Sequence, residues 1–283
     1  MGNFVLHDCK VIKVFNNNVL FVSENEKEKI LFGKGIGFGK KIGDIIKAGL
    51  EVDKIFTIED KTNSANFNEL MNYADQNIIA LSEEIIAMIS NELQEELDEK
   101  IHISLTDHMI FALKRLEDNE EIQNPFLVET ETLYKREFDI AKKAALMIEK
   151  AIGIEIPDGE AGFIALHIHS ARNKGGLSNT IKYNFVSNSV VEFLEDEMKI
   201  EIDRQSLDYA RFLTHIRFAI ERILNNNPIK NDLISAIKKQ YKDSYKVARK
   251  AAKIIENQLC IEVIEDEIAY LAIHIERLKQ VSH

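Results

Sequence analysis

The feature that most constrains this chain is an internal duplication that keeps its histidines in register. The matching segments are TDHMIFALKR at 106–115 with LTHIRFAIER at 213–222, and ALHI at 165–168 with AIHI at 272–275. His108 and His215 are 107 positions apart, and so are His167 and His274. One offset shared by two separate motifs indicates two copies of one module, with two histidines in each copy.

Helical periodicity fills both copies. Between the paired histidines the same offset matches, among others, Tyr134 with Tyr241 and Glu160 with Glu267. Apolar residues follow the three-and-four spacing of a buried helical stripe from 70 to 89, and comparable stripes recur at 141–148 and 248–255. We therefore expect two homologous all-α helical-bundle domains, at residues 66–173 and 177–283, with the best linker candidate at 172–179 (RNKGGLSN).

The first 60 residues have the pattern of β-structure instead. Short β-branched or aromatic runs are separated by Asn16–Asn18, by the charged stretch 24–29 and by the glycine-rich stretch 33–41. This predicts a small antiparallel β domain at residues 1–60, with three or four strands. The polar stretch 59–66 ends it and caps the next helix. The predicted fold class is a multi-domain chain, with a small antiparallel β domain followed by two helical bundles.

Charge is distributed unevenly along the chain. The net charge is −11, yet residues 1–50 hold eight lysines against five acidic residues, so a basic head precedes an acidic remainder. Two cysteines are too few for a disulfide framework or a thiolate metal cage. No apolar run approaches the length of a membrane span, and the first residues lack the features of a secretion signal. These observations predict a cytoplasmic protein without membrane insertion.

The glycine-rich stretch of the head (GKGIGFGKK, 33–41) predicts a loop that presents Lys34, Phe38 and Lys40 outward. Lysines neutralise phosphates, an aromatic ring stacks on an unpaired base, and the amides of Asn16–Asn18 can read base edges. Nucleic-acid binding is one reading of this pattern, and a cradle for a nucleotide phosphate is another. A Walker motif is absent, since Lys41 is followed by Ile42 rather than by Ser or Thr.

The paired histidines suggest phosphoryl acceptance. A neutral imidazole is a good nucleophile near neutral pH and needs no base to deprotonate it. An arginine follows seven positions after His108 and after His215, on the same helical face, and could recruit the added negative charge. Asp107 is placed to orient the ring of His108. A lone histidine is usually a structural core residue, but recurrence as two registered pairs favours a functional role.

The rival chemistry is metal binding by His167 and His169. An H-x-H pair converges on a metal when it lies on a strand, whereas the helical pattern here turns the two rings far apart. Glu276 replaces the second histidine in the other copy. The remaining histidines, His7, His102 and His283, have no internal counterpart and are expected to be surface or local residues.

Taken together, these motifs resemble the BglG/SacY family of transcription antiterminators over nearly the whole chain. The resemblance rests on KVFNNNV at 13–19, GKGIGFGKK at 33–41, DKIF at 53–56 and the four histidine motifs. It is closest to the glucose-operon subgroup of Gram-positive bacteria, through the loop at 33–41, NPFL at 124–127 and HIHSA at 167–171.

The resemblance implies an RNA-binding head that works as a homodimer and clamps a leader-mRNA hairpin against a terminator. It implies RNA contacts at Lys13, Asn18, Lys34, Gly35, Gly37 and Phe38, and phosphorylation at His108, His167, His215 and His274. The implied phosphoryl donors are the phosphocarrier protein HPr and a sugar-specific permease of the phosphotransferase system. Neither catalysis nor a cofactor is expected. A DNA-binding activator with the same regulatory modules is the alternative, followed by a metal-dependent enzyme using His167 and His169.

Overall fold

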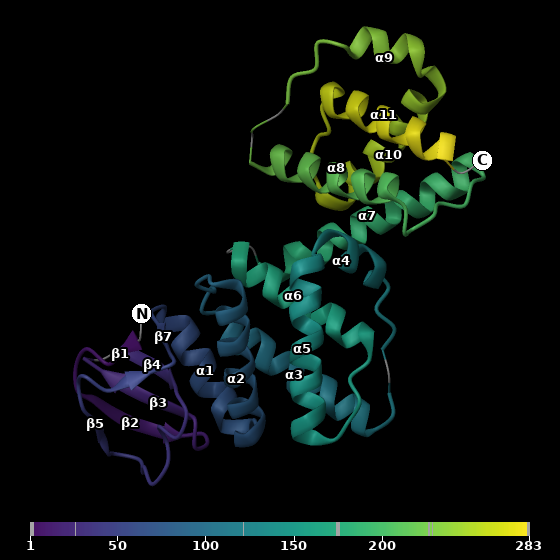
Figure 1. The fold of residues 1–283 in the computed structure, drawn as a ribbon. Helices are drawn as coiled ribbons and strands as arrows, with labels where there is room; N and C mark the ends of the chain where they lie inside the picture. The colour runs from purple at the N-terminus through teal and green to yellow at the C-terminus, as the bar shows by residue number, and fades with distance from the viewer. Residues whose placement is uncertain are drawn as a thin grey trace. The chain divides into compact units, whose positions relative to one another are not determined.

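The computed structural model describes residues 3–25, 27–120, 122–173, 176–225, 227 and 229–281. The chain forms two compact units: residues 1–124 with 136–177, and residues 125–135 with 178–283. The first unit contains the β-sheet and most helices of the first copy, and the second contains the helices of the second copy (Figure 1). The predicted fold class, a small antiparallel sheet followed by helical domains, is confirmed.

The head contains more strands than its sequence pattern predicts. Its strands are β1 (Asn3–Phe4), β2 (Cys9–Val14), β3 (Val19–Glu24), β4 (Lys27–Phe32), β5 (Ile45–Ile46), β6 (Glu51–Val52) and β7 (Lys54–Ile58). One antiparallel sheet has the order β5-β2-β3-β4-β7, and β1 pairs with β6. The additional strands β1, β5 and β6 span two residues each, which is too short for an alternating pattern to be recognised in the sequence.

Strand β3 is central in the sheet, and its residues are buried on both faces. Leu20 and Val22 pack with Val11 in the apolar cluster of one face. On the other face the ring of Phe21 lies 5.4 Å, centroid to centroid, from Phe67 of helix α1 (Lys61–Tyr73). Alternate side chains of a strand point to opposite faces, so a strand covered on both sides has apolar residues at consecutive positions, as at 19–22 here. The predicted cap of α1 is confirmed, since Asp60 accepts hydrogen bonds from the first turn.

The other helices follow the predicted repeat. Those of the first unit are α2 (Gln76–Leu93), α3 (Ile101–Glu117), α5 (Lys135–Ile152) and α6 (Asp158–Asn173). Those of the second unit are α4 (Leu127–Leu133), α7 (Leu177–Met198), α8 (Leu207–Leu224), α9 (Ile234–Gln240), α10 (Lys242–Leu259) and α11 (Glu265–Val281). The expected linker at 172–179 is short, because α6 ends at Asn173 and α7 begins at Leu177, and positions 174 and 175 lie outside the described residues. No helix in the described part of the chain has both the length and the apolar content of a membrane crossing.

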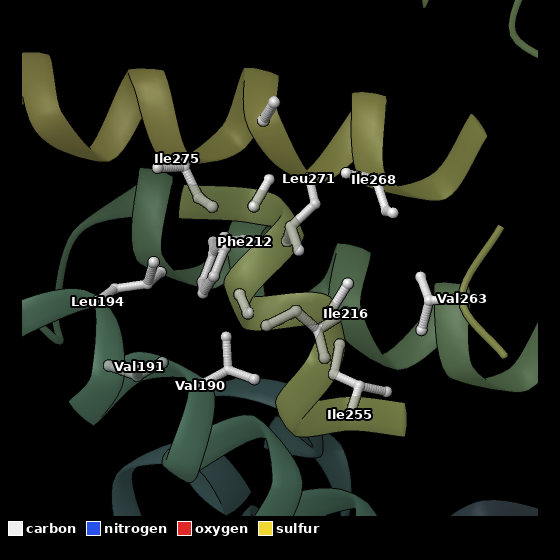
Figure 2. Packing of buried hydrophobic residues seen from close by; sticks show 14 of the residues in the cluster. Val190, Val191, Leu194, Phe212, Ile216, Ile255, Val263, Ile268, Leu271 and Ile275 are labelled. Carbon is white, nitrogen blue, oxygen red and sulfur yellow. The ribbon is translucent and has the colours of Figure 1, made fainter. Parts of the chain in front are cut away.

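The core of the second unit joins α7, α8, α10 and α11. Figure 2 shows Val190 of α7, Phe212 and Ile216 of α8, Ile255 of α10 and Ile275 of α11 in one packed cluster. Four of them have an exposed fraction of at most 1%, and Ile255 has 3%. Burying a large apolar side chain contributes roughly 1.5–3 kcal/mol, so such a cluster is the main source of stability for these helices.

Helix α4 packs mainly against α8 and belongs to the second unit, although its sequence lies in the first copy. The buried carboxylate of Glu129 on α4 accepts hydrogen bonds from Tyr209 Oη on α8 (2.6 Å) and from Arg204 Nη1 (3.1 Å). Burial and the neighbouring Glu129 carboxylate raise the pKa of the Tyr209 phenol, so it remains a donor. The counterpart of α4 in the second copy, α9, packs instead on α10 and α11. The two copies therefore share sequence register but use this helix differently.

Candidate functional site

The two histidines of the first copy lie ring to ring. His108 is on α3 and His167 on α6, and their ring centroids are 5.1 Å apart. The Nδ1 atom of His167 lies 3.2 Å from Ser104 Oγ, also on α3. The packing of α3 against α6 thus unites two motifs that are far apart in the sequence into one site.

A buried glutamate completes this site. Glu160, in the first turn of α6, places Oε2 3.3 Å from His108 Nε2 and accepts a hydrogen bond from Arg115 Nη2 at Oε1 (2.9 Å). Burial alone would raise the pKa of the Glu160 carboxyl, but the contacts with His108 and Arg115 outweigh burial and lower that pKa below its usual value. Asp107 bonds to the hydroxyl of Tyr73 (3.1 Å). The carboxylate that meets the His108 ring is therefore that of Glu160, not the expected Asp107.

The second copy repeats the histidine pair, the glutamate and the arginine, whereas Arg211 stands where the first copy has Ser104. The rings of His215 (α8) and His274 (α11) stack with centroids 4.5 Å apart. Arg222 donates two hydrogen bonds to Glu267, from Nε to Oε1 (2.7 Å) and from Nη2 to Oε2 (2.6 Å). Glu267 Oε2 lies 4.0 Å from His215 Nε2. Both modules thus place a histidine pair beside one buried carboxylate that an arginine neutralises.

Burial lowers the pKa of three of these histidines, His167, His215 and His274, and the paired histidines differ in access to solvent. Burial, with the nearby His274 and Arg222, lowers the pKa of His215 to about 3. Burial and the neighbouring His108 hold the pKa of His167 well below its usual value. The side chains of His108 and His215 are 14% and 13% exposed, whereas His167 is 7% exposed. A neutral imidazole retains the lone pair that a nucleophile needs.

The geometry does not bring His167 and His169 together. His167 meets Ser104, whereas Nδ1 of His169 lies 3.0 Å from Glu137 Oε1. Burial would raise the pKa of the Glu137 carboxyl, but the hydrogen bonds from His169 and from its own backbone lower it to about 2. No group of three His, Cys, Asp or Glu side chains among the described residues is arranged to hold a metal ion. The metal reading of this pair has no support in the structure.

In the head, the asparagine loop (Asn16–Asn18) and the glycine-rich loop (33–41) are in direct contact. The backbone amide of Gly35 donates to Asn18 Oδ1 (3.1 Å), and that of Gly37 donates to Asn17 O (2.9 Å). A Cβ atom on Gly37 would lie 2.2 Å from Asn16 O, so only glycine fits there. The structure therefore brings three of the expected RNA-contact positions, at 18, 35 and 37, together where the two loops meet, with Gly37 itself buried.

The other expected RNA contacts border this surface in different ways. The ring of Phe38 is 77% exposed, and Lys34 is exposed beside it. Both line an open groove of about 700 Å³ between the glycine-rich loop and residues 50–53. Lys13, on β2, is turned away from this groove, and its Nζ lies 3.3 Å from Met71 O of α1. A large aromatic ring left in water beside a lysine is suited to stacking on an unpaired base.

Sequence reasoning missed two residues of consequence. Glu160 matches Glu267 across the repeat, and that match was the one available signal, but an acidic residue in a first helical turn usually has only a local role. His102, expected to be a surface or local residue, is 2% exposed, and its Nδ1 lies 2.7 Å from the buried Glu83 Oε2. Its ring also lies 4.8 Å, centroid to centroid, from Phe56 of β7. His283 lies outside the described residues.

A β-sheet head followed by two helical modules with registered histidine pairs defines a modular regulatory protein. The model of the PRD domain matches residues 83–171 and 188–278, and that of the CAT RNA binding domain matches residues 9–65. The chain is 36% identical over 272 residues to the protein GlcT of Staphylococcus saprophyticus, covering 95% of this chain and 97% of that protein. It is also 36% identical over 273 residues to the transcription antiterminator LicT of Bacillus subtilis, covering 95% and 98%.

One solved structure matches a little over half of this chain. The crystal structure of GlcT CAT-PRDI has a TM-score of 0.51 and 46% sequence identity, and the match covers 58% of this chain and 98% of that one. The chain belongs to the BglG/SacY family of transcription antiterminators, built from a CAT RNA-binding domain and PRD domains. Members of this family are RNA-binding regulators rather than enzymes. A DNA-binding activator is not favoured, because the described residues of the head form strands and no helix-turn-helix.

Proposed function

We propose that this chain is a sugar-responsive transcription antiterminator that binds a leader-mRNA hairpin as a homodimer and prevents formation of the terminator. The proposed domains are the RNA-binding head at 1–60 and two regulation domains at 66–173 and 177–283. The matched models at 9–65, 83–171 and 188–278 support this division.

The proposed RNA contacts are Lys13, Asn18, Lys34, Gly35, Gly37 and Phe38. Support comes from the fitted asparagine and glycine-rich loops and from the exposed Phe38 ring beside Lys34. Stacking of a base on an aromatic ring contributes roughly 1–3 kcal/mol, so Phe38→Ala should weaken binding about 5- to 150-fold. RNA affinity should also fall steeply with salt, as is typical when lysines neutralise phosphates. Binding that is insensitive to salt and to Phe38→Ala would point to another ligand.

The proposed phosphorylation sites are His108, His167, His215 and His274. The observation that carries this proposal is the repeated arrangement of two imidazoles packed ring to ring beside a buried glutamate and an arginine. In the transfer, the bond from phosphorus to the donor's side-chain atom breaks as a bond from phosphorus to the accepting ring nitrogen forms. The donors are HPr, acting on the second domain, and the sugar-specific permease, acting on the first.

A phosphoryl group on His108 would change the local charge balance. It carries about two negative charges, which the carboxylate of Glu160 repels and the guanidinium of Arg115 attracts. Arg115 is one-quarter exposed and long enough to exchange one partner for the other, whereas Glu160 is fixed in the core. Transfer of Arg115 from Glu160 to the phosphate would loosen the contact between α3 and α6, and this is the proposed switch.

Phosphate mapping tests the assignment directly. The chain is incubated with phosphoenolpyruvate, the enzyme that charges HPr, HPr and the permease domain, and acid-labile phosphate is located by mass spectrometry. We expect label on the four paired histidines and its loss on substitution of each by alanine. His169→Gln is the matched control, since His169 is near the site but has no histidine counterpart. Label confined to His169, or none, would refute the proposal.

A reporter assay tests the regulatory consequence. With a leader fused to a reporter gene, His108→Ala should keep transcription on without sugar, because the inactivating phosphate has no acceptor. A reporter that stays silent in that variant would contradict the assignment of His108.

A further inference from the structure

The asparagine loop of the head contacts α2 of the first regulation domain. Glu84 Oε1 accepts hydrogen bonds from Asn16 Nδ2 (2.9 Å) and from Asn18 Nδ2 (3.1 Å). The amide oxygens of both asparagines are used within the head: that of Asn16 accepts from the backbone of Asn18 and Val19, and that of Asn18 accepts from Gly35. The side-chain donors of Asn16 and Asn18 are thus directed to a residue outside the head.

Two further side chains, Gln76 and Lys13, link the end of β2 and the start of the following loop to the helices. Gln76, at the start of α2, donates from Nε2 to Phe15 O (2.9 Å) and to Val14 O. Lys13 Nζ donates to Met71 O near the end of α1 (3.3 Å). Strand β2 and the loop after it are therefore fixed by the corner between α1 and α2.

The proposed RNA surface is consequently divided in two. Lys34 and Phe38 are exposed and available, whereas Lys13 and Asn18 are bonded to the regulation domain. An N–H of Asn18 that bonds to Glu84 cannot at the same time donate to a base. The carboxylate also places a negative charge at a surface that must accept phosphates.

We propose that Glu84 sets the RNA affinity of this chain from outside the RNA-binding head, as a competitor that RNA must displace from Asn16 and Asn18. This inference rests on the proposed function, since it presupposes that RNA binds this surface. The contact with Glu84 defines a closed state, and RNA binds the open state. The apparent dissociation constant therefore exceeds the intrinsic one by the inverse of the open fraction.

The test compares RNA affinities of full-length variants. A pool of RNA hairpins with randomised internal loops is enriched on the wild-type chain, and one enriched hairpin is then used for all titrations. Glu84→Ala removes both hydrogen bonds and the charge, and should tighten binding about tenfold if the closed state holds about 90% of molecules. Glu84→Gln retains an acceptor without the charge and should give a smaller gain.

Two matched variants separate the competing explanations. Glu69→Gln removes the same charge from an exposed position on α1 and should change affinity less than about twofold. Gln76→Ala removes a neighbouring contact to Phe15 without changing the charge, and should also tighten RNA binding, as Glu84→Ala does. Helical content measured by circular dichroism confirms that each variant is folded.

The outcomes distinguish a failure of the Glu84 proposal from a failure of the proposed RNA binding. If no hairpin is enriched, or Phe38→Ala binds as well as the wild type, the proposed function fails and the inference with it. If a hairpin is enriched and Phe38→Ala weakens its binding, the function stands. In that case, folded Glu84→Ala and Gln76→Ala variants that bind no better than the wild type overturn the inference alone.

Discussion

Acidification should destabilise the second unit through His215. The folded protein keeps this ring neutral, because burial lowers its pKa to about 3, whereas an unfolded chain has the ordinary value near ~6.5. Below pH 6.5 the unfolded state binds a proton that the folded state does not. The stability associated with this group is therefore complete above pH 6.5 and is progressively lost as the pH falls toward 3.

The magnitude follows from the difference in proton binding. Between pH 7.5 and pH 5.5, the unfolded imidazole changes from about 10% to about 90% protonated while the folded one stays neutral. Integrating that difference gives a loss of about 1.4 kcal/mol in the free energy of unfolding from His215 alone. The ring is only 13% exposed, so solvent screens little of this effect.

Hydrogen exchange resolves this loss locally. Opening free energies are measured for peptides of α8 and α11 at both pH values, with the intrinsic exchange rates corrected for pH. In His215→Gln the same peptides should lose about 1.4 kcal/mol less than in the wild type over this range, whatever the variant's stability at pH 7.5. An equal loss in both proteins would show that the His215 ring is not held neutral by the fold.

Three further outcomes are expected. Gly37→Ala forces a Cβ into the backbone of the facing loop. It should destabilise the head by about 1–3 kcal/mol in thermal unfolding and abolish RNA binding in a titration. Arg115→Gln leaves the buried carboxylate of Glu160 without its cation. It should lower the free energy of unfolding of the first unit by about 3–5 kcal/mol, measured with urea, while α8 and α11 keep their protection from hydrogen exchange. Tyr209→Phe removes the hydroxyl that donates to Glu129. It should lower the free energy of unfolding of the second unit by about 1–3 kcal/mol and speed proteolysis within residues 125–135. An unchanged cleavage rate would contradict the docking of α4.

The sequence was sufficient to predict the histidine pairs because a repeat with constant offset preserves contacts as well as residues. His108 and His167 lie ring to ring, as do His215 and His274. The role of Glu160 was not predictable in the same way, because its partners come from another helix and its own position suits an ordinary helix start. Contacts between elements depend on packing angles, and those are not encoded in local periodicity.

The head shows the same limit. Longer runs of β-branched and aromatic residues such as β3 were recognisable, but the two-residue strands form only because the rest of the chain places them side by side. The contact of Glu84 with the asparagine loop had no sequence signal, since a glutamate on a helix is most often solvated. Residues that connect domains are therefore the hardest to identify from one sequence.

The position of α4 means that the peptide chain passes between the two compact units three times, near residues 125, 136 and 178. Cleavage of a single bond after Asn173 would not free one half from the other, since the amino-terminal fragment would still have α4 inserted in the carboxy-terminal one. Such nicked halves should co-elute in size-exclusion chromatography until denaturant is added. Exchange of α4 therefore holds the two copies together through noncovalent contacts, which two tandem domains joined only by a linker would lack.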